Sequence, residues 1–245
     1  MHRFFVSPEQ LKAERPVITG PDVRHAVKVL RLGPGDVVEL LDGQGRAARA
    51  GIEEAGRDQV VCLRLEEFSP GGEPPVRVTL VQGLAKGEKM DLVIQKSTEL
   101  GVAEIIPLVS RRSVVRLEGG KALERQERWQ RIAMEAAKQC RRAVVPPVRP
   151  PMNLSLVLQE IPAGTASFLP WEEERGQSLG HLLRGDNPGR VYLFIGPEGG
   201  FEASEVEEAG LRGVHAVSLG HRILRTETAG LACLSIIMNR WGDLG

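Results

Sequence analysis

The sequence predicts a protein of two domains: a small antiparallel β-barrel, then a larger α/β domain built on a parallel sheet. Three observations carry this prediction. Short alternating apolar runs flank Asp42-Gly43 near the start of the chain. A cluster of proline and glycine fills residues 69–75, where neither helix nor strand can continue. Strand-like and helix-like segments then alternate. We therefore expect domains at 1–70 and 76–245.

The first domain is expected to be a barrel of half-buried strands. VVELL and VVCLRL alternate apolar and polar residues, and Asp42-Gly43 follows the first of them as a hairpin signal. A helical turn over 21–31 would place Arg24, Lys28 and Arg31 on one basic stripe. This stripe is equally well explained as a solvated face or as a contact for RNA.

The second domain begins with a strand–helix–strand unit. VRVTLVQGL (76–84) predicts a strand, 88–100 has a helical period that ends at Gly101, and VAEIIPLV (102–109) predicts the next strand. Such βαβ order is typical of parallel sheets.

A long basic helix is predicted next, over 121–143. Arg111, Arg112 and Arg116 precede it, and Lys138, Arg141 and Arg142 lie near its end. Residues 76–150 carry 15 basic and 8 acidic groups, whereas 151–245 carry 7 and 12, so a net charge of zero conceals a positive middle. Basic helix faces are usually only solvated, and contact with RNA or phosphate is the less common explanation.

The last third of the chain continues the α/β pattern. We expect helices at 154–161 and 177–183, strands at 166–170 and 190–195, and a final helix over 226–241. The final helix is apolar on most sides, which favours burial, in part against a second subunit.

Composition excludes several classes of protein. No apolar run approaches the roughly 20 residues of a membrane span, and the first residues lack the apolar centre of a signal peptide. A cytoplasmic location is therefore expected. The three cysteines form no CxxC pair and the five histidines have no ligand spacing, so no metal site is expected.

Two glycine-marked loops follow strand-like segments and predict a ligand site. IGPEGG lacks the lysine of a P-loop and the spacing of a dinucleotide fingerprint. LGHRILRTETAG supplies backbone groups and Arg225. Each loop alone is explained by a simple turn. Two such loops, with a third at 169–172, favour a binding site at the carboxyl edge of a parallel sheet.

These residues resemble a known family. IGPEGGF with SLGHRILRTETA resembles the paired signatures of the small-subunit (16S) ribosomal RNA uridine-N3 methyltransferases, a branch of the SPOUT methyltransferases. HAVKVLRLGPGDVVELLDGQG resembles the PUA-like RNA-binding barrel of that family, and RWQRIAMEAAKQCRR its basic helix. The likeness covers nearly the whole chain. Glu202 departs from it, because a small helix-capping residue is expected there.

The resemblance implies a PUA-like barrel and a SPOUT α/β domain with a trefoil knot, assembled as a homodimer. It also implies that three loops bind S-adenosylmethionine. The cofactor-binding residues implied are Leu169, Pro170, Glu172, Ile195, Gly196, Pro197, Glu198, Gly199, Leu219, Gly220, Ile223, Leu224 and Thr228.

The implied reaction is methylation of N3 of a uridine in 16S ribosomal RNA. Arg225 is expected to stabilise the anion that forms as N3 loses its proton, and Glu198 or Glu227 to accept the proton or position the base. The RNA-binding residues expected are Arg24, Lys28, Arg31, Arg111, Arg112, Lys138, Arg141 and Arg142.

Two alternatives remain open at this point. One is a related knotted enzyme that methylates ribose, another base or transfer RNA. The other is a non-catalytic RNA-binding or ribosome-assembly protein that keeps the loops only as turns.

Overall fold

The computed structural model of the chain describes residues 1–113 and 120–245, so Arg116 lies outside the described residues. These residues form two compact units: Met1–Glu73 with Ala137–Val145, and Pro74–Ala136 with Pro146–Gly245. The chain passes from the first unit to the second at Glu73 and Pro74, inside the segment rich in proline and glycine. No local pattern in the sequence indicates that 137–145 packs with the first unit.

The first unit is a five-stranded sheet with short helices. Its elements are β1 His2–Phe5, α1 Pro8–Lys12, β2 Val17–Thr19, α2 Pro21–Arg24, the π-helical turn His25–Val29, β3 Val37–Leu41, β4 Ala47–Ala55 and β5 Gln59–Phe68. The strand order is β1-β3-β4-β5-β2. β1 pairs with β3 in parallel and the other pairs are antiparallel. In the described part of the chain β1 and β2 are edges, so the sheet is not a closed barrel.

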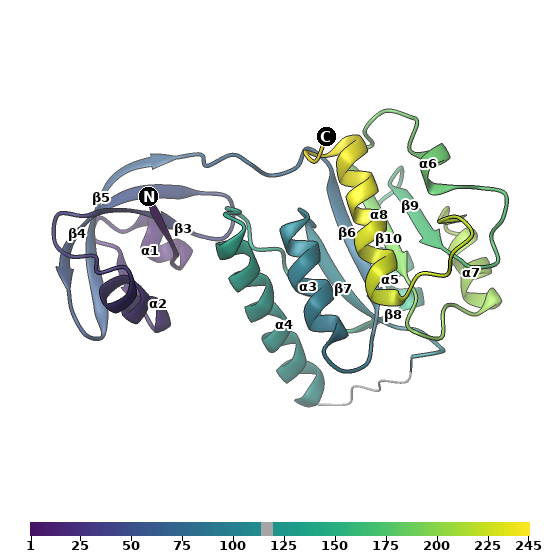
Figure 1. Ribbon diagram of the computed structural model, residues 1–245, viewed down its shortest axis with the longest axis horizontal. Helices are drawn as coiled ribbons and strands as arrows, with labels where there is room; N and C mark the ends of the chain where they lie inside the picture. Colours follow the sequence, from purple (N-terminus) through teal and green to yellow (C-terminus); the bar gives the residue numbers. More distant parts are fainter. Residues whose placement is uncertain (114–119) are drawn as a thin grey trace. The chain divides into compact units, whose positions relative to one another are not determined.

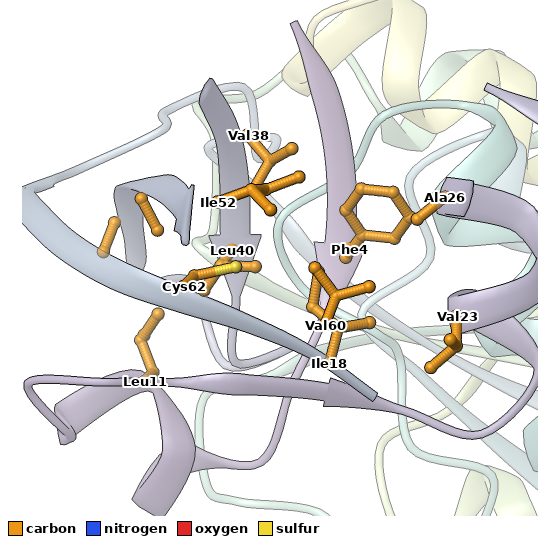
Figure 2. Packing of buried hydrophobic residues seen from close by; sticks show 12 residues of the cluster. Phe4, Leu11, Ile18, Val23, Ala26, Val38, Leu40, Ile52, Val60 and Cys62 are labelled. Atoms are coloured by element: carbon orange, nitrogen blue, oxygen red, sulfur yellow. The ribbon is translucent and has the colours of Figure 1, made fainter. Parts of the chain in front are cut away.

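The core of the first unit lies between the sheet and its helices (Figure 2). Phe4, Val38 and Val60 from the strands meet Val23 and Ala26 from the helical segment, and all five are buried. Burial of large side chains of this kind contributes about 1.5–3 kcal/mol each. The alternation seen in the sequence therefore corresponds to one buried and one exposed face.

The second unit is a parallel α/β sheet (Figure 1). Its strand order is β11-β9-β10-β6-β7-β8, and every pair is parallel. Its elements are β6 Arg77–Gly83, α3 Lys89–Glu99, β7 Glu104–Val109, α4 Gly120–Gln139, β8 Met152–Asn153, α5 Leu154–Glu160, β9 Ala166–Pro170, α6 Leu179–Leu182, β10 Arg190–Ile195, α7 Ala203–Gly210, β11 His215–Val217 and α8 Thr226–Trp241. The last three residues of α4 belong to the first unit.

Helices cover both faces of this sheet. α3 and α8 lie side by side over one face (Figure 1). On that face Leu80 and Ile195 approach Gly230 of α8. α5 and α7 cover the other face, where Phe194 joins their core. Ile195 and Phe194 are neighbours on one strand, so their side chains point to opposite faces. The sheet is therefore buried on both sides, as parallel sheets are.

The basic helix ends earlier than the sequence predicted. α4 stops at Gln139, and Arg141 adopts φ +65°. The Arg142 amide donates to Ala137 O at 3.0 Å and the Arg141 amide to Lys138 O at 3.3 Å, which is the Schellman pattern. Glycine normally takes the left-handed position, and its absence here hid the end of the helix.

The predicted stripe of the first unit is also shorter. Arg24 and Lys28 lie on α2 and the π-helical turn, but Arg31 follows that turn with φ +56°. All three side chains are exposed.

The final helix, α8, is largely buried within the chain. Cys233, Leu234, Ile237 and Met238 are fully enclosed, whereas Ile236 is exposed. Among the described residues, no helix is long and apolar enough to cross a membrane.

Candidate active site

A cavity of about 630 Å³ lies in the second unit at the carboxyl ends of β9, β10 and β11. Three segments line most of it, and we name them by their residues: the 170–175 loop, the 195–201 loop and the 218–225 loop. Lys89, Thr226 and Ala229 complete the lining. Its volume is within the range that holds a small molecule or cofactor.

The 195–201 loop is held against the sheet by close backbone packing. A Cβ on Gly83 would lie 2.4 Å from Pro197 N and 2.7 Å from Gly196 C, so only glycine fits there. Gly200 has φ +68° and its amide donates to Pro197 O at 2.9 Å, which closes the turn. Gly200 of the loop therefore serves a tight turn, and Gly83 of β6 serves the close approach.

Thr226, the first residue of α8, joins this loop to the sheet. Its hydroxyl donates to Gly196 O at 2.6 Å and accepts from Gln82 Nε2 at 2.9 Å. Gln82 is completely buried in β6.

Glu198 is anchored by two donors. The Lys86 amide donates to its Oε1 at 3.0 Å and Lys89 Nζ does so at 3.3 Å. Desolvation raises the pKa of Glu198, but the hydrogen bonds from the Lys86 amide and Lys89 outweigh it, and the net pKa is lowered. Lys89 Nζ also lies 3.3 Å from Glu227 Oε2, so one ammonium bridges both carboxylates.

Arg111 and Arg112 flank the same loop. Arg112 Nη1 donates to Gly199 O at 3.0 Å, and Arg111 Nη1 donates to Ser204 Oγ at 2.9 Å. Glu202 occupies the N-cap of α7, where a small residue was expected, and the buried Glu205 carboxylate accepts its amide at 2.9 Å. The departure at Glu202 is therefore accommodated by a capping box.

Beyond Ser218, whose backbone is hydrogen-bonded to Gln177 and Leu179, the 218–225 loop is mostly exposed. Gly220 has φ +95°, with no atom within 4 Å of the place where a Cβ would lie, and Ile223 is 84% exposed. Arg225 is exposed at the N-cap of α8. Among the residues that the structure describes, none forms a hydrogen bond or ion pair with its guanidinium. Its donors are available to a ligand.

The cavity brings together most of the predicted site. Arg225 and ten of the predicted cofactor residues line it: Pro170, Glu172, Ile195, Gly196, Pro197, Glu198, Leu219, Gly220, Ile223 and Leu224. Leu169 is buried behind it, and Gly199, Glu227 and Thr228 are not in the lining.

Sequence reasoning missed several residues of the lining, among them Lys89, Trp171, Phe201, Arg222 and Thr226. Thr226 and Arg222 lie inside a motif that had already been singled out. Lys89 lies 109 residues away from Glu198 in the chain, and no local pattern connects them.

The predicted RNA-binding residues fall into two groups. Arg24, Lys28, Arg31 and Arg141 of the first unit, with Arg111 and Arg112 of the second, have exposed or half-exposed side chains. Lys138 is paired with Asp22 at 3.1 Å, and the buried Arg142 with Glu73 at 2.6 Å. Since Arg142 already has a partner and is enclosed, it is the least accessible of the set.

Comparison with known proteins identifies the class of this protein as RNA methyltransferase. A family model described as an RNA methyltransferase domain matches residues 72–238, and one described as an RNA methyltransferase PUA domain matches residues 18–63. A protein of Bacillus subtilis named ribosomal RNA small subunit methyltransferase E is 36% identical, over 97% of this chain and 96% of its own. The chain belongs to this methyltransferase E family.

Solved structures agree with this assignment. The methyltransferase E of Neisseria gonorrhoeae, bound to S-adenosylmethionine, has a TM-score of 0.87 at 34% identity and covers 100% of both chains. A putative methyltransferase of Legionella pneumophila with the same cofactor has a TM-score of 0.82 at 31% identity and covers 99% of this chain and 98% of that one. The predicted family and its two-domain fold are confirmed, whereas the knot stays a prediction.

Proposed function

We propose that this protein transfers a methyl group from S-adenosylmethionine to N3 of a uridine in small-subunit ribosomal RNA. The observation that carries the proposal is the cavity formed by three loops at the carboxyl edge of the parallel sheet. The names of the relatives support the ribosomal substrate, and the cofactor in two related structures supports the methyl donor.

The residues present fit such a cofactor. Glycines in two loops let the backbone approach a flat base closely. The Glu172 carboxylate oxygens lie 3.7 Å from the Cβ position of Gly200, so the 170–175 loop and the 195–201 loop meet there. Ile223 and Leu224 offer apolar contact. We propose that these residues and the others predicted from the three loops bind S-adenosylmethionine, whose sulfonium supplies an electrophilic methyl group.

The chain must then activate uridine N3. N3 carries an imide proton, and its lone pair becomes nucleophilic when that proton leaves and charge spreads onto the flanking carbonyl oxygens. The N3–C bond then forms as the C–S bond breaks. Arg225 is the proposed stabiliser of that charge, because a guanidinium keeps its own charge and its donors have no partner among the described residues.

Glu198 is poorly suited to accept the imide proton. Its lowered pKa makes it a weak base, and its carboxylate is committed to Lys86 and Lys89. We assign it instead to anchoring the 195–201 loop. Glu227 also lies 3.3 Å from Lys89 Nζ, but its Oε2 accepts no hydrogen bond among the described residues, so it stays the proposed carboxylate for placing the base or accepting the proton.

Substrate binding is proposed to use the exposed basic side chains. Arg24, Lys28, Arg31 and Arg141 would contact the RNA backbone from the first unit, and Arg111 and Arg112 from beside the cavity. Lys138 and Arg142 remain proposed contacts, although both are paired. Uridine N3 is hidden in a base pair, so the target must be unpaired or flipped out.

Three further properties belong to this proposal: a trefoil knot in the second unit, a homodimer and a cytoplasmic location. The exposed Ile236 on α8 and Leu92 on α3 are consistent with a dimer surface there.

The proposal is tested by nucleoside mass analysis of small-subunit RNA from a strain that lacks the gene. Loss of N3-methyluridine, restored by the wild-type gene and not by an Arg225→Ala gene, is expected. An unchanged N3-methyluridine level, or loss of a ribose-methylated nucleoside instead, would exclude this substrate. Calorimetry of the purified protein with S-adenosylmethionine separately tests whether it is an enzyme of this kind at all.

A further inference from the structure

A buried series of hydrogen bonds connects β6, the start of α8 and the 195–201 loop. We infer that Gln82 and Thr226 are positioning residues, which hold the Gly196–Pro197 peptide in the geometry that the cofactor requires. This inference rests on the proposed function, since it assigns a task within the same cavity. Gln82 does not line the cavity and acts through Thr226.

The direction of each hydrogen bond in this series is determined. Gln82 Nε2 lies 3.2 Å from Gly83 O and 2.9 Å from Thr226 Oγ1. The opposite orientation of the amide would set its oxygen against the Gly83 carbonyl oxygen, so nitrogen must face both atoms. Thr226 Oγ1 therefore accepts from Gln82, and its single proton is left for Gly196 O at 2.6 Å.

Burial of the polar Gln82 side chain costs free energy, and apolar packing does not explain why an amide stands at this position. Its side chain is 0% exposed in a strand whose neighbours are apolar. An amide in such a place is stabilised only through its hydrogen bonds. Its Oε1 has no hydrogen-bond partner among the described residues and lies 3.0 Å from the Cβ position of Gly230. The amide oxygen is thus unsatisfied, whereas the amide nitrogen donates to Gly83 O and to Thr226, which lines the cavity.

The Gly196–Pro197 peptide is restrained from two sides. Gly83 of β6 packs closely against it, and the Thr226 hydroxyl donates a hydrogen bond to its carbonyl oxygen. Proline has no amide hydrogen, so this peptide has no other conventional donor or acceptor. The Thr226 hydroxyl is consequently the one described side chain that hydrogen-bonds it.

The same hydroxyl joins the two sides of the site. Thr226 directly follows Arg225, which caps α8. A bond from Thr226 to Gly196 therefore links the 195–201 loop to the residue proposed to stabilise the reacting base. Loss of this bond is expected to loosen the cofactor loop without unfolding the sheet.

The test compares Thr226→Val, which removes only the hydroxyl, with Thr226→Ser, which keeps it. Thr79→Val is the matched control, because Thr79 lies on the opposite face of β6 and its hydroxyl interacts with Glu104 at 3.4 Å and with Tyr192, neither of which lines the cavity. Two quantities are measured: hydrogen exchange of amides 196–201 in the ligand-free protein, and the Kd for S-adenosylmethionine. Gln82→Met, of similar size, is measured alongside.

Thr226→Val and Gln82→Met are expected to exchange faster at 196–201 and to bind S-adenosylmethionine about five- to tenfold more weakly, as for loss of one buried hydrogen bond. Thr226→Ser and Thr79→Val are expected to stay within about twofold of wild type. Wild-type exchange or wild-type affinity in Thr226→Val would overturn the inference. Equal losses in Thr226→Ser and Thr226→Val would overturn it too, because the methyl group and not the hydroxyl would then matter. If the wild-type protein itself binds no S-adenosylmethionine, the proposed function fails, and so does the part of the inference that concerns the cofactor. The hydrogen-exchange data then still decide whether Thr226 holds the 195–201 loop.

Discussion

The 195–201 loop and the 218–225 loop line one cavity but are built differently. The first is packed on Gly83, hydrogen-bonded by Thr226 and Arg112, and anchored through Glu198 to the residues that precede α3. The second exposes Ile223 and Arg225, and no atom lies within 4 Å of the Cβ position of Gly220. Both contain glycine, yet only the first uses glycine for close packing.

This difference separates two tasks. A loop that is already in place loses little conformational entropy when a ligand binds, which favours affinity. A loop with few buried contacts adapts at low cost and can enclose the ligand afterwards. We therefore expect changes near 195–201 to alter both stability and binding, and changes in 218–225 to alter binding or catalysis alone.

The largest effect is expected from Arg225→Ala in the open loop. Loss of one donor to a developing anion lowers kcat by about 10²–10³-fold. Because the side chain is exposed and has no partner among the described residues, the Tm is expected to stay unchanged. Single-turnover methylation measures the loss of rate, and thermal unfolding measures the Tm. Arg225→Lys, which keeps the positive charge but not the paired donors of the guanidinium, is the control. Normal turnover by Arg225→Ala would remove this residue from the mechanism.

Gly83→Ala is the next largest and concerns the packed loop. Its new methyl would meet Pro197 N at 2.4 Å, and such overpacking costs about 1–3 kcal/mol of unfolding free energy. Binding of S-adenosylmethionine is expected to weaken as well, because the loop must shift. Gly210→Ala is the control, since no atom lies within 4 Å of its Cβ position. Equal denaturant midpoints for the two variants would contradict the close packing of Gly83 on Pro197.

Ile223→Ala distinguishes the two loops most sharply. An 84% exposed side chain contributes little to the folded state, so unfolding free energy is expected to change by less than about 0.5 kcal/mol. Affinity for S-adenosylmethionine is expected to fall by up to about tenfold if the loop covers the ligand and buries this side chain. Calorimetry measures the affinity. A stability loss as large as that of Gly83→Ala would mean that the loop is not open.

The smallest effect is expected from the Glu198 anchor, and it depends on pH. Since the folded-state pKa of Glu198 is lowered from 4.5, its ionised form stabilises the protein above pH 4.5, and this stability is lost as pH falls through the lower folded value. Wild type is expected to exceed Glu198→Gln in Tm at pH 7, with a gap that narrows below about pH 4.5. Glu173→Gln, an exposed carboxylate of the same cavity, is the control. A gap that stays constant with pH would exclude the ionic anchor.

Much of the fold could be predicted because its elements are locally encoded. The helix over 88–100 has an apolar period and a terminal glycine, and α3 follows it within one residue at each end. The strand segments 76–84 and 102–109 contain β6 and β7, which pair in parallel as expected. Periodicity and stop signals depend on neighbours in the chain, so they can be read without a structure.

The errors arose where a non-local contact overrides a local signal. Arg141 takes a left-handed conformation that costs about 1–2 kcal/mol for a residue other than glycine. Its carbonyl accepts from Arg3, and Arg142 after it pairs with Glu73. Contacts of 69 and 138 residues in sequence separation leave no trace in the local pattern.

By itself the sequence predicted the two-part architecture, most of the strands and helices in their order, and a ligand site in the glycine loops, because hydrophobic period, turn residues and motif spacing are local properties. Only the tertiary structure decided how those loops differ. It set Gly83 against Pro197, Gln82 behind Thr226 and Lys89 between Glu198 and Glu227. Each of these contacts joins residues far apart in the chain, and their partners are fixed by the packing of the sheet and not by any neighbouring residue.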